Sequence, residues 1–592
     1  RYGERVVLSY RIGDTDILES PWAEGKALTR SLRVGPSAAP LQMLVSSLHK
    51  GEGAESNGVV RFEDAVAALI GAPDGVSLVA VGDQIRLVIA PHDAPITVKL
   101  LTSTGDAAEF AKTVAASAAA ADLSSWTKGG KALWNAPIVT VGKLGDGKGA
   151  FTVDTITPPF DNPYKALFFF GGHDFFANGD AAICTIHGDV WRVSGLDATL
   201  QKVSWKRYAT GMFQPLGLSV RDDVVYVLGR DQITRLHDVN KDGEADFYEN
   251  FNSGCEIGEH VHEYATSLGA DEEGNFYYVK GVNAKQSRHE GTLIKVSPDG
   301  KEFEVYATGF RWPNGGGVGP DGTVTAADQQ GGWVPASRLD IVKKGGFYGH
   351  MPAHHREVAP TEYDGPLTWI PHSIDNSCGG QAWVQGGRWG GLDGHMIHLS
   401  YGKCKPFLVL QESIDGVDQG GVVEIAARFS SGAMRGNFRP ADGQLYVSGL
   451  KGWQTSAAKD GCFERLRYTG KPFCMPVGLN VHTNGLKVVF NQTLDPELAT
   501  DLESWNLERW NYRWTKAYGS EGYKVSDPEV IGHDPVLVQS VTLLPDGRSV
   551  FLDLGSVEPV MQMKIGYDLE TRDGTEVIGA IYNTVHAMRP AH

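Results

Sequence analysis

Two segments of the chain, YATGMFQPLGLSV from Tyr208 and YATGFRWPNGGGVGPDG from Tyr306, decide the fold. Both follow the pattern Tyr-Ala-Thr-Gly-x-x-x-Pro-x-Gly, and they begin 98 residues apart. That offset corresponds to two repeats of roughly 40–50 residues, the usual length of one propeller blade. The repeat therefore predicts a β-propeller in preference to a β-sandwich. It also makes Arg311 equivalent to Phe213, near one face of the propeller and around its central channel.

Short β-like runs separated by tight turns continue from about residue 150 to residue 475. Examples are ADEEGNFYYVKG from Ala270, GPDGTVTAAD from Gly319 and PADGQLYVSG from Pro440. The Asp-Gly type turns tolerate the positive φ that tight hairpins require. The 73 glycines exceed the usual share of about 7%, as a chain with many turns requires. We therefore expect an all-β fold with the propeller over residues 150–475.

The propeller is flanked by two further β-rich regions. Residues 1–149 open with the alternating stretch RVVLSYRIGDTDILES from Arg5, and we expect this domain to begin upstream of residue 1. Residues 476–592 contain alternating runs such as VLVQSVTLLPDGRSVFLDLG from Val536. Their length and pattern predict an immunoglobulin-like β-sandwich. Such domains are usually spacers or packing partners, so we assign this one no chemistry.

Composition excludes several classes of function. The net charge of −17 makes nucleic acid a poor partner. No apolar run reaches the roughly 18 residues that a transmembrane helix needs. The six cysteines form no Cys-x-x-Cys pair, so zinc ribbons and covalently bound haem are not supported. Cys462 and Cys474 flank one apparent hairpin, and both a disulfide and two buried thiols are consistent with the sequence.

The segment DVNKDGEADFYE has the spacing of a calcium-binding loop. Its oxygen-bearing residues fall at positions 1, 3, 5, 7, 9 and 12 of an EF-hand-type loop, with glycine at position 6. These residues are Asp238, Asn240, Asp242, Glu244, Asp246 and Glu249. The flanks are β-like, so we predict a structural calcium site between strands. A solvated acidic turn is the alternative.

The segments GFRWPNGGGVGPDG and GGFYGH carry a resemblance to a known family. They resemble the soluble quinoprotein glucose and sorbosone dehydrogenases in the order of Arg311, Asn314–Gly315, Pro320–Gly322 and Gly345–Gly349. The resemblance implies a six-bladed propeller in which the arginine contacts pyrroloquinoline quinone (PQQ) and the reacting substrate oxygen. A guanidinium group is suited to stabilising charge that develops on a quinone oxygen.

The same resemblance implies further site residues. HVHEYATSLGADEEGNFYYVKG looks like the segment that bears the family's catalytic histidine, which implies His262 as the general base and His260 as the alternative. MRGNFRPADGQLYVSG looks like the segment whose arginine binds the cofactor carboxylates, which implies Arg435. Lys403 and Gln214 match more weakly as cofactor-binding residues.

The chain departs from the family pattern at the site. Val261 stands where the family has aspartate before the catalytic histidine, and Trp312 stands where it has asparagine after the arginine. Glu263 could orient the histidine instead, although neighbours on a strand point to opposite faces. A closer likeness is to the propellers of large multidomain bacterial proteins described as membrane-bound dehydrogenase-like. These often carry a haem c module, which implies a cytochrome c-type electron acceptor and a periplasmic or extracellular location.

Three functions follow from these observations. The first is an oxidoreductase that oxidises a sugar or polyol with PQQ. The second is a carbohydrate hydrolase or lyase that uses paired carboxylates from Glu263, Asp328 or Asp375. The third is a binding or assembly module without catalysis. Stacking on a sugar ring and packing within the propeller are equally consistent with three tryptophans, Trp312, Trp333 and Trp453. The histidines at 350, 354, 355 and 372 have no diagnostic metal spacing.

Overall fold

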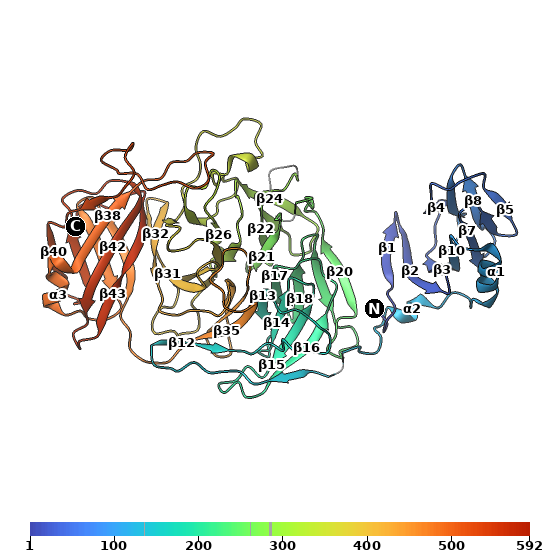
Figure 1. Ribbon diagram of the computed structural model, residues 1–592, viewed down its shortest axis with the longest axis horizontal. Helices are drawn as coiled ribbons and strands as arrows, with labels where there is room; N and C mark the ends of the chain where they lie inside the picture. The colour runs from blue at the N-terminus through green and yellow to red at the C-terminus, as the bar shows by residue number, and fades with distance from the viewer. Residues whose placement is uncertain (135, 261, 283–286) are drawn as a thin grey trace. The chain divides into compact units, whose positions relative to one another are not determined.

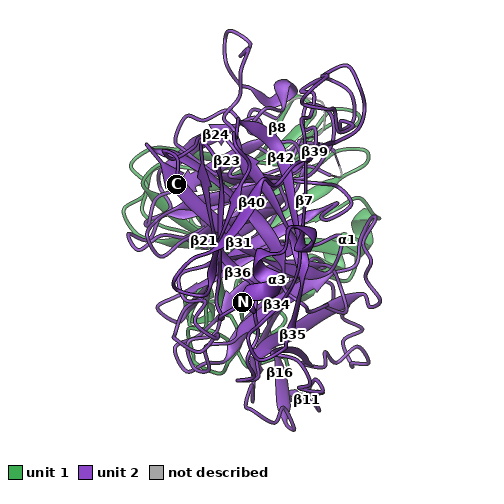
Figure 2. Ribbon diagram, turned by 90° about the vertical axis from the view of Figure 1, so that its left-hand side faces the viewer, with its two compact units in different colours: residues 1–135, 237–248 green, residues 136–236, 249–592 purple. Residues whose placement is uncertain are grey.

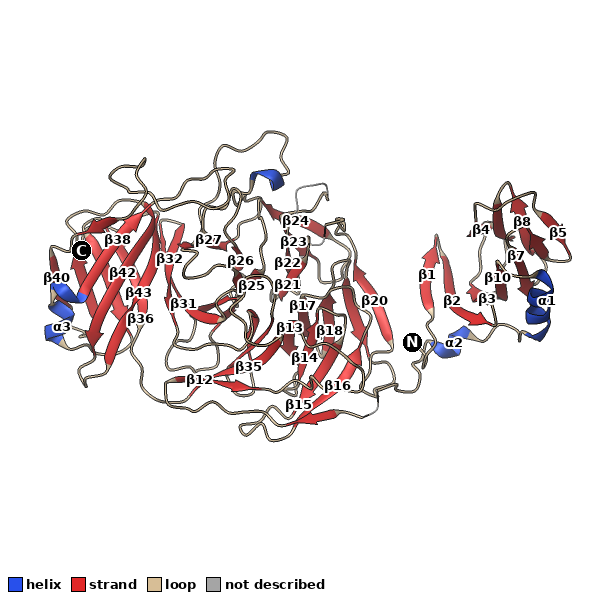
Figure 3. Ribbon diagram, in the orientation of Figure 1, coloured by secondary structure: helices blue, strands red, loops and turns tan. Residues whose placement is uncertain are grey.

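The computed structural model describes residues 1–134, 136–260, 262–282 and 287–592. Strands dominate these ranges (Figure 3), so the prediction of a mainly β protein is confirmed. The helices within them are α1 (Ala107–Ala116), α2 (Leu123–Trp126), α3 (Pro496–Thr500) and the 3-10 turns η1 (Met351–Ala353) and η2 (Leu502–Ser504). The chain forms two compact units (Figure 2): residues 1–135 with 237–248, and residues 136–236 with 249–592.

The first unit contains a seven-stranded sheet in the order β1-β2-β3-β10-β7-β6-β5 and a three-stranded sheet in the order β4-β9-β8. Apolar side chains of both sheets, including Ile17, Leu87 and Leu100, form one buried core. Asp106 caps α1 by accepting hydrogen bonds from two main-chain N–H groups of its first turn. The strands are β1 (Leu8–Ile12), β2 (Thr15–Glu24), β3 (Ala27–Val34), β4 (Leu41–Ser46), β5 (Ala54–Ser56), β6 (Val59–Arg61), β7 (Val66–Ile70), β8 (Val76–Val81), β9 (Gln84–Ile89) and β10 (Ile96–Ser103).

The second unit begins with a series of antiparallel sheets that follow one another along the chain (Figure 1). Their innermost strands are β13 (Phe170–Phe175), β17 (Gly217–Arg221), β21 (Ala265–Ala270), β25 (Gly315–Val318), β29 (Cys378–Trp383) and β33 (Ala433–Phe438). Each innermost strand contacts the next, and β33 contacts β13, so these strands close a ring. The last sheet is completed by β12 (Phe151–Thr155), which pairs with β35 (Gly461–Tyr468).

The outer strands of the ring complete each sheet by hairpin connections. In chain order they are β14 (Ala181–Thr185), β15 (Val190–Ser194), β16 (Val203–Ala209), β18 (Val224–Leu228), β19 (Ile233–His237), β20 (Phe247–Asn252), β22 (Phe276–Lys280), β23 (Thr292–Val296), β24 (Phe303–Thr308), β26 (Val324–Asp328), β27 (Ser337–Ile341), β28 (Thr368–Ile370), β30 (Met396–Ser400), β31 (Lys405–Ile414), β32 (Val417–Glu424) and β34 (Leu445–Leu450). The strand β11 (Ile138–Thr140) pairs with β16 at the edge of the first sheet.

Glycines allow the innermost strands to approach each other closely. A Cβ atom on Gly171 would lie 2.2 Å from the carbonyl oxygen of Pro215, and one on Gly315 would lie 1.6 Å from that of Gly379. Both distances are far below van der Waals contact, so only glycine fits at these positions. The glycine excess thus serves ring closure as well as turns.

The C-terminal region packs directly onto the ring. Strand β43 (Glu576–Val585) pairs with β32, and β42 (Val560–Glu570), β38 (Trp505–Trp510) and β39 (Asp534–Val536) extend the same sheet. A second sheet contains β36 (Pro476–His482), β37 (Gly485–Phe490), β41 (Ser549–Asp553) and β40 (Ser540–Leu543). One apolar core joins the two sheets to the last two sheets of the ring.

All six cysteines are free thiols, so Cys462 and Cys474 form no disulfide. Within the described ranges, no helix is both long and apolar enough to cross a bilayer.

Candidate functional site

The predicted site residues lie where the innermost strands begin. Gln214 comes just before β17, His262 just before β21, and Arg311 and Asn314 just before β25. Lys403 lies in the turn between β30 and β31. This turn is tied to the segment before β29, because the Gly402 N–H donates to the Ser377 carbonyl oxygen at 2.9 Å. We call this end of the ring the strand-start face. The opposite end, where these strands finish, is the strand-end face.

Arg435 spans the centre of the ring. Its guanidinium Nη1 donates to the carbonyl oxygens of Asn314 at 2.6 Å and Met434 at 2.8 Å, and Nη2 donates to that of Leu216 at 3.0 Å. These acceptors belong to the segments of β17, β25 and β33, which are every second innermost strand of the ring. Burial lowers the pKa of Arg435 to about 9, so the group stays protonated at neutral pH. Its Nε atom is buried and has no hydrogen-bond partner among the described residues.

Arg311 is held between two aromatic rings. Its guanidinium carbon lies 4.1 Å from the ring centre of Trp312 and 4.9 Å from that of Tyr518. Its Nη1 donates to the carbonyl oxygen of Gln330 at 3.0 Å, while its main-chain N–H donates to Asp328. Within the described ranges no carboxylate pairs with this guanidinium, so its remaining N–H groups can bind a ligand.

His262 is exposed and lies against Trp312. The ring centres are 5.4 Å apart with an interplanar angle of 74°. Glu263, by contrast, is buried and forms an ion pair with Lys280 at 2.8 Å. The two neighbouring side chains therefore point in opposite directions, and Glu263 does not orient the imidazole. Val261 lies outside the described residues.

His260 and Gln214 are tied to Arg230 on the same face. Gln214 Oε1 accepts a hydrogen bond from Arg230 Nη1 at 3.1 Å, and Arg230 Nη2 donates to the carbonyl oxygen of His260. The His260 Nδ1 atom accepts the main-chain N–H of His262 at 3.0 Å. This hydrogen bond makes His260 a support for the loop that presents His262.

Lys403 is close to His372. Burial and, next, the charge of Lys403 lower the pKa of His372. No ion pair joins Lys403 to a carboxylate in the part of the chain that the structure describes.

Asn314 Nδ2 donates to the carbonyl oxygen of Cys378 at 3.1 Å, which links the β25 and β29 segments. The structure thus joins Asn314 and Arg435 by a direct contact, whereas Arg311 has its own partners in Trp312, Gln330 and Tyr518.

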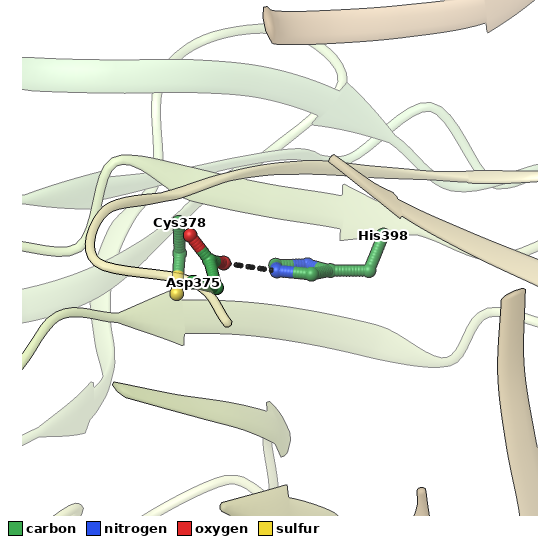
Figure 4. A group of neighbouring side chains, drawn as sticks. All are labelled: Asp375, Cys378 and His398. Atoms are coloured by element: carbon green, nitrogen blue, oxygen red, sulfur yellow. Dashed lines mark hydrogen bonds and ion pairs between the residues drawn. The ribbon is translucent and has the colours of Figure 1, made fainter. Parts of the chain in front are cut away.

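Figure 4 shows Asp375, Cys378 and His398 side by side. All three are buried, and they are the one group of three potential metal ligands found among the described residues. Gln381 Nε2 donates to His398 Nδ1 at 3.1 Å and to the Gly379 carbonyl oxygen at 2.9 Å. The His398 proton therefore lies on Nε2, which donates to Asp375 at 2.8 Å. These bonds satisfy the imidazole and make the cluster a structural network.

Asp375 and Asp328 are both fully buried. Asp375 also accepts from the Ser400 hydroxyl at 2.6 Å, and Asp328 accepts from the main-chain N–H groups of Trp312 and Gln329, each at 2.8 Å. Sequence reasoning missed this anchoring role of Asp328. The aspartate at the end of the alternating run TVTAAD, 16 residues after Trp312, was the available signal.

The predicted calcium loop forms a compact turn in the first unit. Asp238 accepts the main-chain N–H of Asp242 at 3.1 Å. The carboxylate of Asp246 lies inside the turn, because its Oδ2 accepts the N–H groups of Val239 at 3.1 Å and Asn240 at 3.3 Å. Its Oδ1 is buried without a hydrogen-bond partner among the described residues. Burial, together with the charges of Asp242 and Asp246, raises the pKa of Asp238.

The two glutamates of the predicted calcium set have other partners. Glu244 is buried, pairs with Arg1 at 2.7 Å and accepts main-chain N–H groups of residues 133–134. Only its carbonyl oxygen is left for a cation, as is usual at position 7 of such loops. Glu249 pairs with Arg235 at 2.7 Å.

A cavity of about 340 Å³ opens toward the strand-end face. Residues from all of the innermost strands line it, including Asp174, Ser219, Gln381 and Arg435. Burial raises the pKa of Asp174 to about 6. Arg435 therefore separates this cavity from the strand-start face.

Comparison with known proteins gives structural likenesses only. No protein-family model and no curated protein matches the chain. An oxidoreductase from Thermus thermophilus, named as a glucose dehydrogenase, is 16% identical, with a TM-score of 0.42 over 53% of this chain and 99% of its own. The PQQ-bound aldose sugar dehydrogenase from Streptomyces coelicolor is 15% identical, with a TM-score of 0.40 over 54% and 99%. The PQQ domain of pyranose dehydrogenase from Coprinopsis cinerea is 11% identical, with a TM-score of 0.40 over 55% and 97%.

Proposed function

We propose that the chain is an oxidoreductase that oxidises a sugar or polyol with PQQ at the strand-start face. The proposed scaffold is a six-bladed β-propeller with an immunoglobulin-like C-terminal sandwich. The single observation that carries the proposal is that exposed His262 lies against Trp312, and Trp312 against Arg311, a guanidinium with no carboxylate partner among the described residues. Arg435 and Lys403 add two further cations to the segments of the ring. Three cations without carboxylate partners among the described residues, two of them (Arg311 and Arg435) buried, are costly unless an anion compensates them.

The residues fit an anionic quinone. PQQ carries carboxylates, and the orphaned Nε of buried Arg435 is a donor that still needs an acceptor. Arg435, Lys403, Asn314 and Gln214 would hold the cofactor. When bound, the quinone would supply a two-electron acceptor for the hydride of the substrate.

The chain's own residues would position the substrate and move its proton. The exposed imidazole of His262 takes the proton of the reacting hydroxyl group, which a neutral histidine does well near pH 7. Arg311 donates hydrogen bonds to the oxygen on which charge develops. The Trp312 and Tyr518 rings keep its guanidinium in place.

The hydrolase or lyase alternative lacks its carboxylates. Asp328 and Asp375 are fully buried in hydrogen-bond networks, and Glu263 is buried in its ion pair with Lys280. A glycosidase needs two carboxyl groups that flank an accessible glycosidic bond. The structure therefore favours the oxidoreductase over this alternative.

Titration of the purified chain with PQQ and Ca²⁺, followed by dye reduction with a panel of aldoses and polyols, tests the proposal. His262→Gln should lower kcat by about 100-fold or more, because a positioned base contributes that much. His260→Gln tests the alternative base and should lower kcat much less, because glutamine keeps an acceptor for the main-chain N–H of His262. Absence of both saturable PQQ binding and dye reduction would overturn the proposal.

We also propose that the loop over residues 238–246 binds a structural Ca²⁺. The partnerless buried Oδ1 of Asp246 and the mutual repulsion of its carboxylates support this, because a cation would relieve both. Terbium luminescence should saturate in the wild type and be lost in Asp238→Asn. Unchanged luminescence in that variant would contradict the site.

A cytochrome c-type acceptor and a periplasmic or extracellular location complete the proposal. The net charge of −17 suits a basic electron-transfer partner. Reduction of a basic cytochrome c should then slow as ionic strength rises, because salt screens the attraction. Fractionation of the source cells checks the location.

A further inference from the structure

A loop of the C-terminal region reaches the strand-start face. It runs from the end of β38 to Tyr523 and is bonded along its length to residues 331–335, between β26 and β27. The Trp333 N–H donates to the Thr515 carbonyl oxygen at 2.9 Å, and the Gly519 N–H donates to that of Gly331 at 3.1 Å. The Trp514 Nε1 atom also donates to the Gly349 carbonyl oxygen at 2.8 Å. The C-terminal region, to which the sequence assigned no chemistry, therefore lies against the segment that holds Arg311.

These bonds place Tyr518 over Arg311 with its ring largely open to solvent. The ring centre is 4.9 Å from the guanidinium carbon, and the residue is 70% exposed. The four groups form a row: His262 lies against Trp312, Trp312 against Arg311, and Arg311 against Tyr518. The guanidinium occupies one face of the Tyr518 ring and leaves the other face for a ligand.

We propose that Tyr518 is a substrate-binding residue, an aromatic platform for the second sugar ring of an oligosaccharide. Aromatic faces pack well on the apolar faces of sugar rings. With the reacting sugar at His262, a ring on Tyr518 belongs to the next residue, beyond Trp312 and Arg311. The substrate class is then a saccharide of two or more residues with a free reducing end. This inference rests on the proposed function for the identity of the reacting end.

The test compares Tyr518→Ala and Tyr518→Phe with Lys516→Ala, an exposed change in the same loop. Calorimetric titration of each protein without cofactor, using glucose, maltose and cellobiose, measures sugar binding directly. Tyr518→Ala should weaken disaccharide binding about 10-fold and leave glucose binding unchanged, while the other two variants keep wild-type affinity. Thermal melting checks that all variants are folded.

Dye reduction by the PQQ-loaded proteins gives a second readout. Tyr518→Ala should raise KM for the disaccharides with kcat unchanged. Equal disaccharide affinity in the wild type and Tyr518→Ala, or an equal loss for glucose, would overturn the inference while leaving the oxidoreductase proposal intact. If disaccharide binding depends on Tyr518 but the chain neither binds PQQ nor reduces the dye, the oxidoreductase proposal is wrong and the sugar-binding role of Tyr518 is supported.

Discussion

At the scale of single residues, the position of Arg311 depends on a neighbouring glycine. A Cβ atom on Gly331 would lie 2.1 Å from the guanidinium carbon of Arg311. Gly331→Ala should therefore displace the guanidinium from its place between Trp312 and Tyr518. Because a side chain and not backbone must move, we expect the fold to persist and kcat/KM for the sugar to fall at least 10-fold.

Gly332→Ala is the matched control for that change. Its nearest neighbour, the Lys516 carbonyl oxygen, would be 3.4 Å from the added atom, which is ordinary contact. Melting curves and steady-state dye reduction of the two variants separate loss of folding from loss of Arg311. Equal activity of the two variants would argue against a role for Arg311.

Asp174 makes the stability of the ring depend on pH. Its carboxylate accepts the main-chain N–H groups of Val220 and Phe175, each at 2.8 Å, but burial still raises its pKa to about 6. The folded chain thus holds this proton more tightly than the unfolded chain does. The protonated Asp174 therefore adds to the free energy of unfolding below pH about 4. This contribution, roughly 1–3 kcal/mol, is lost as the pH rises through about 6.

Urea unfolding between pH 4 and 8 checks this expectation. The wild type should lose free energy of unfolding relative to Asp174→Asn over that range, since asparagine does not titrate. Parallel pH profiles of the two proteins would show that Asp174 has an ordinary pKa.

At the scale of elements, close contact between innermost strands limits side-chain size. A Cβ atom on Gly315 of β25 would lie 1.6 Å from the carbonyl oxygen of Gly379 in β29, so Gly315→Ala must push two strands apart. We expect a loss of about 3 kcal/mol of stability or more. In the adjacent Gly316→Ala the nearest atom is 3.4 Å away, so we expect less than about 1 kcal/mol. Denaturant midpoints of the two variants provide the comparison.

The sequence predicted the strands of the ring better than the partners of its side chains. Asp-Gly turns and the repeat from Tyr208 and Tyr306 indicate hairpins because their chemistry is local. Glu263 lies in the loop before β21 and pairs with Lys280 at the end of β22, and no strand alternation predicts the direction of a loop side chain. The contacts of Arg435 with Asn314 and Leu216 span more than 100 residues, so no local pattern encodes them.

The whole molecule shows why the role of Tyr518 could not be predicted. Its place in the site depends on packing between the C-terminal region and the ring, and the sequence carries no periodic signal for that packing. The bonds from residues 515–520 to residues 331–335 are main-chain bonds, which are independent of residue type. A domain that was expected to be a spacer thus contributes an aromatic side chain to the candidate site.

The shared core makes a further prediction about the whole chain. Strand β32 of the ring pairs with β43 in the register Val422↔Tyr582, and Leu410 and Val423 share one buried cluster with Val488 and Ile565. A chain ending at residue 475 would expose that cluster and the edge of β32, which favours aggregation. We expect residues 1–475 to be insoluble, or to lack the cooperative melting of residues 1–592. A soluble, monodisperse chain of residues 1–475 with an unchanged melting temperature would mean that the ring is stable without its C-terminal partner.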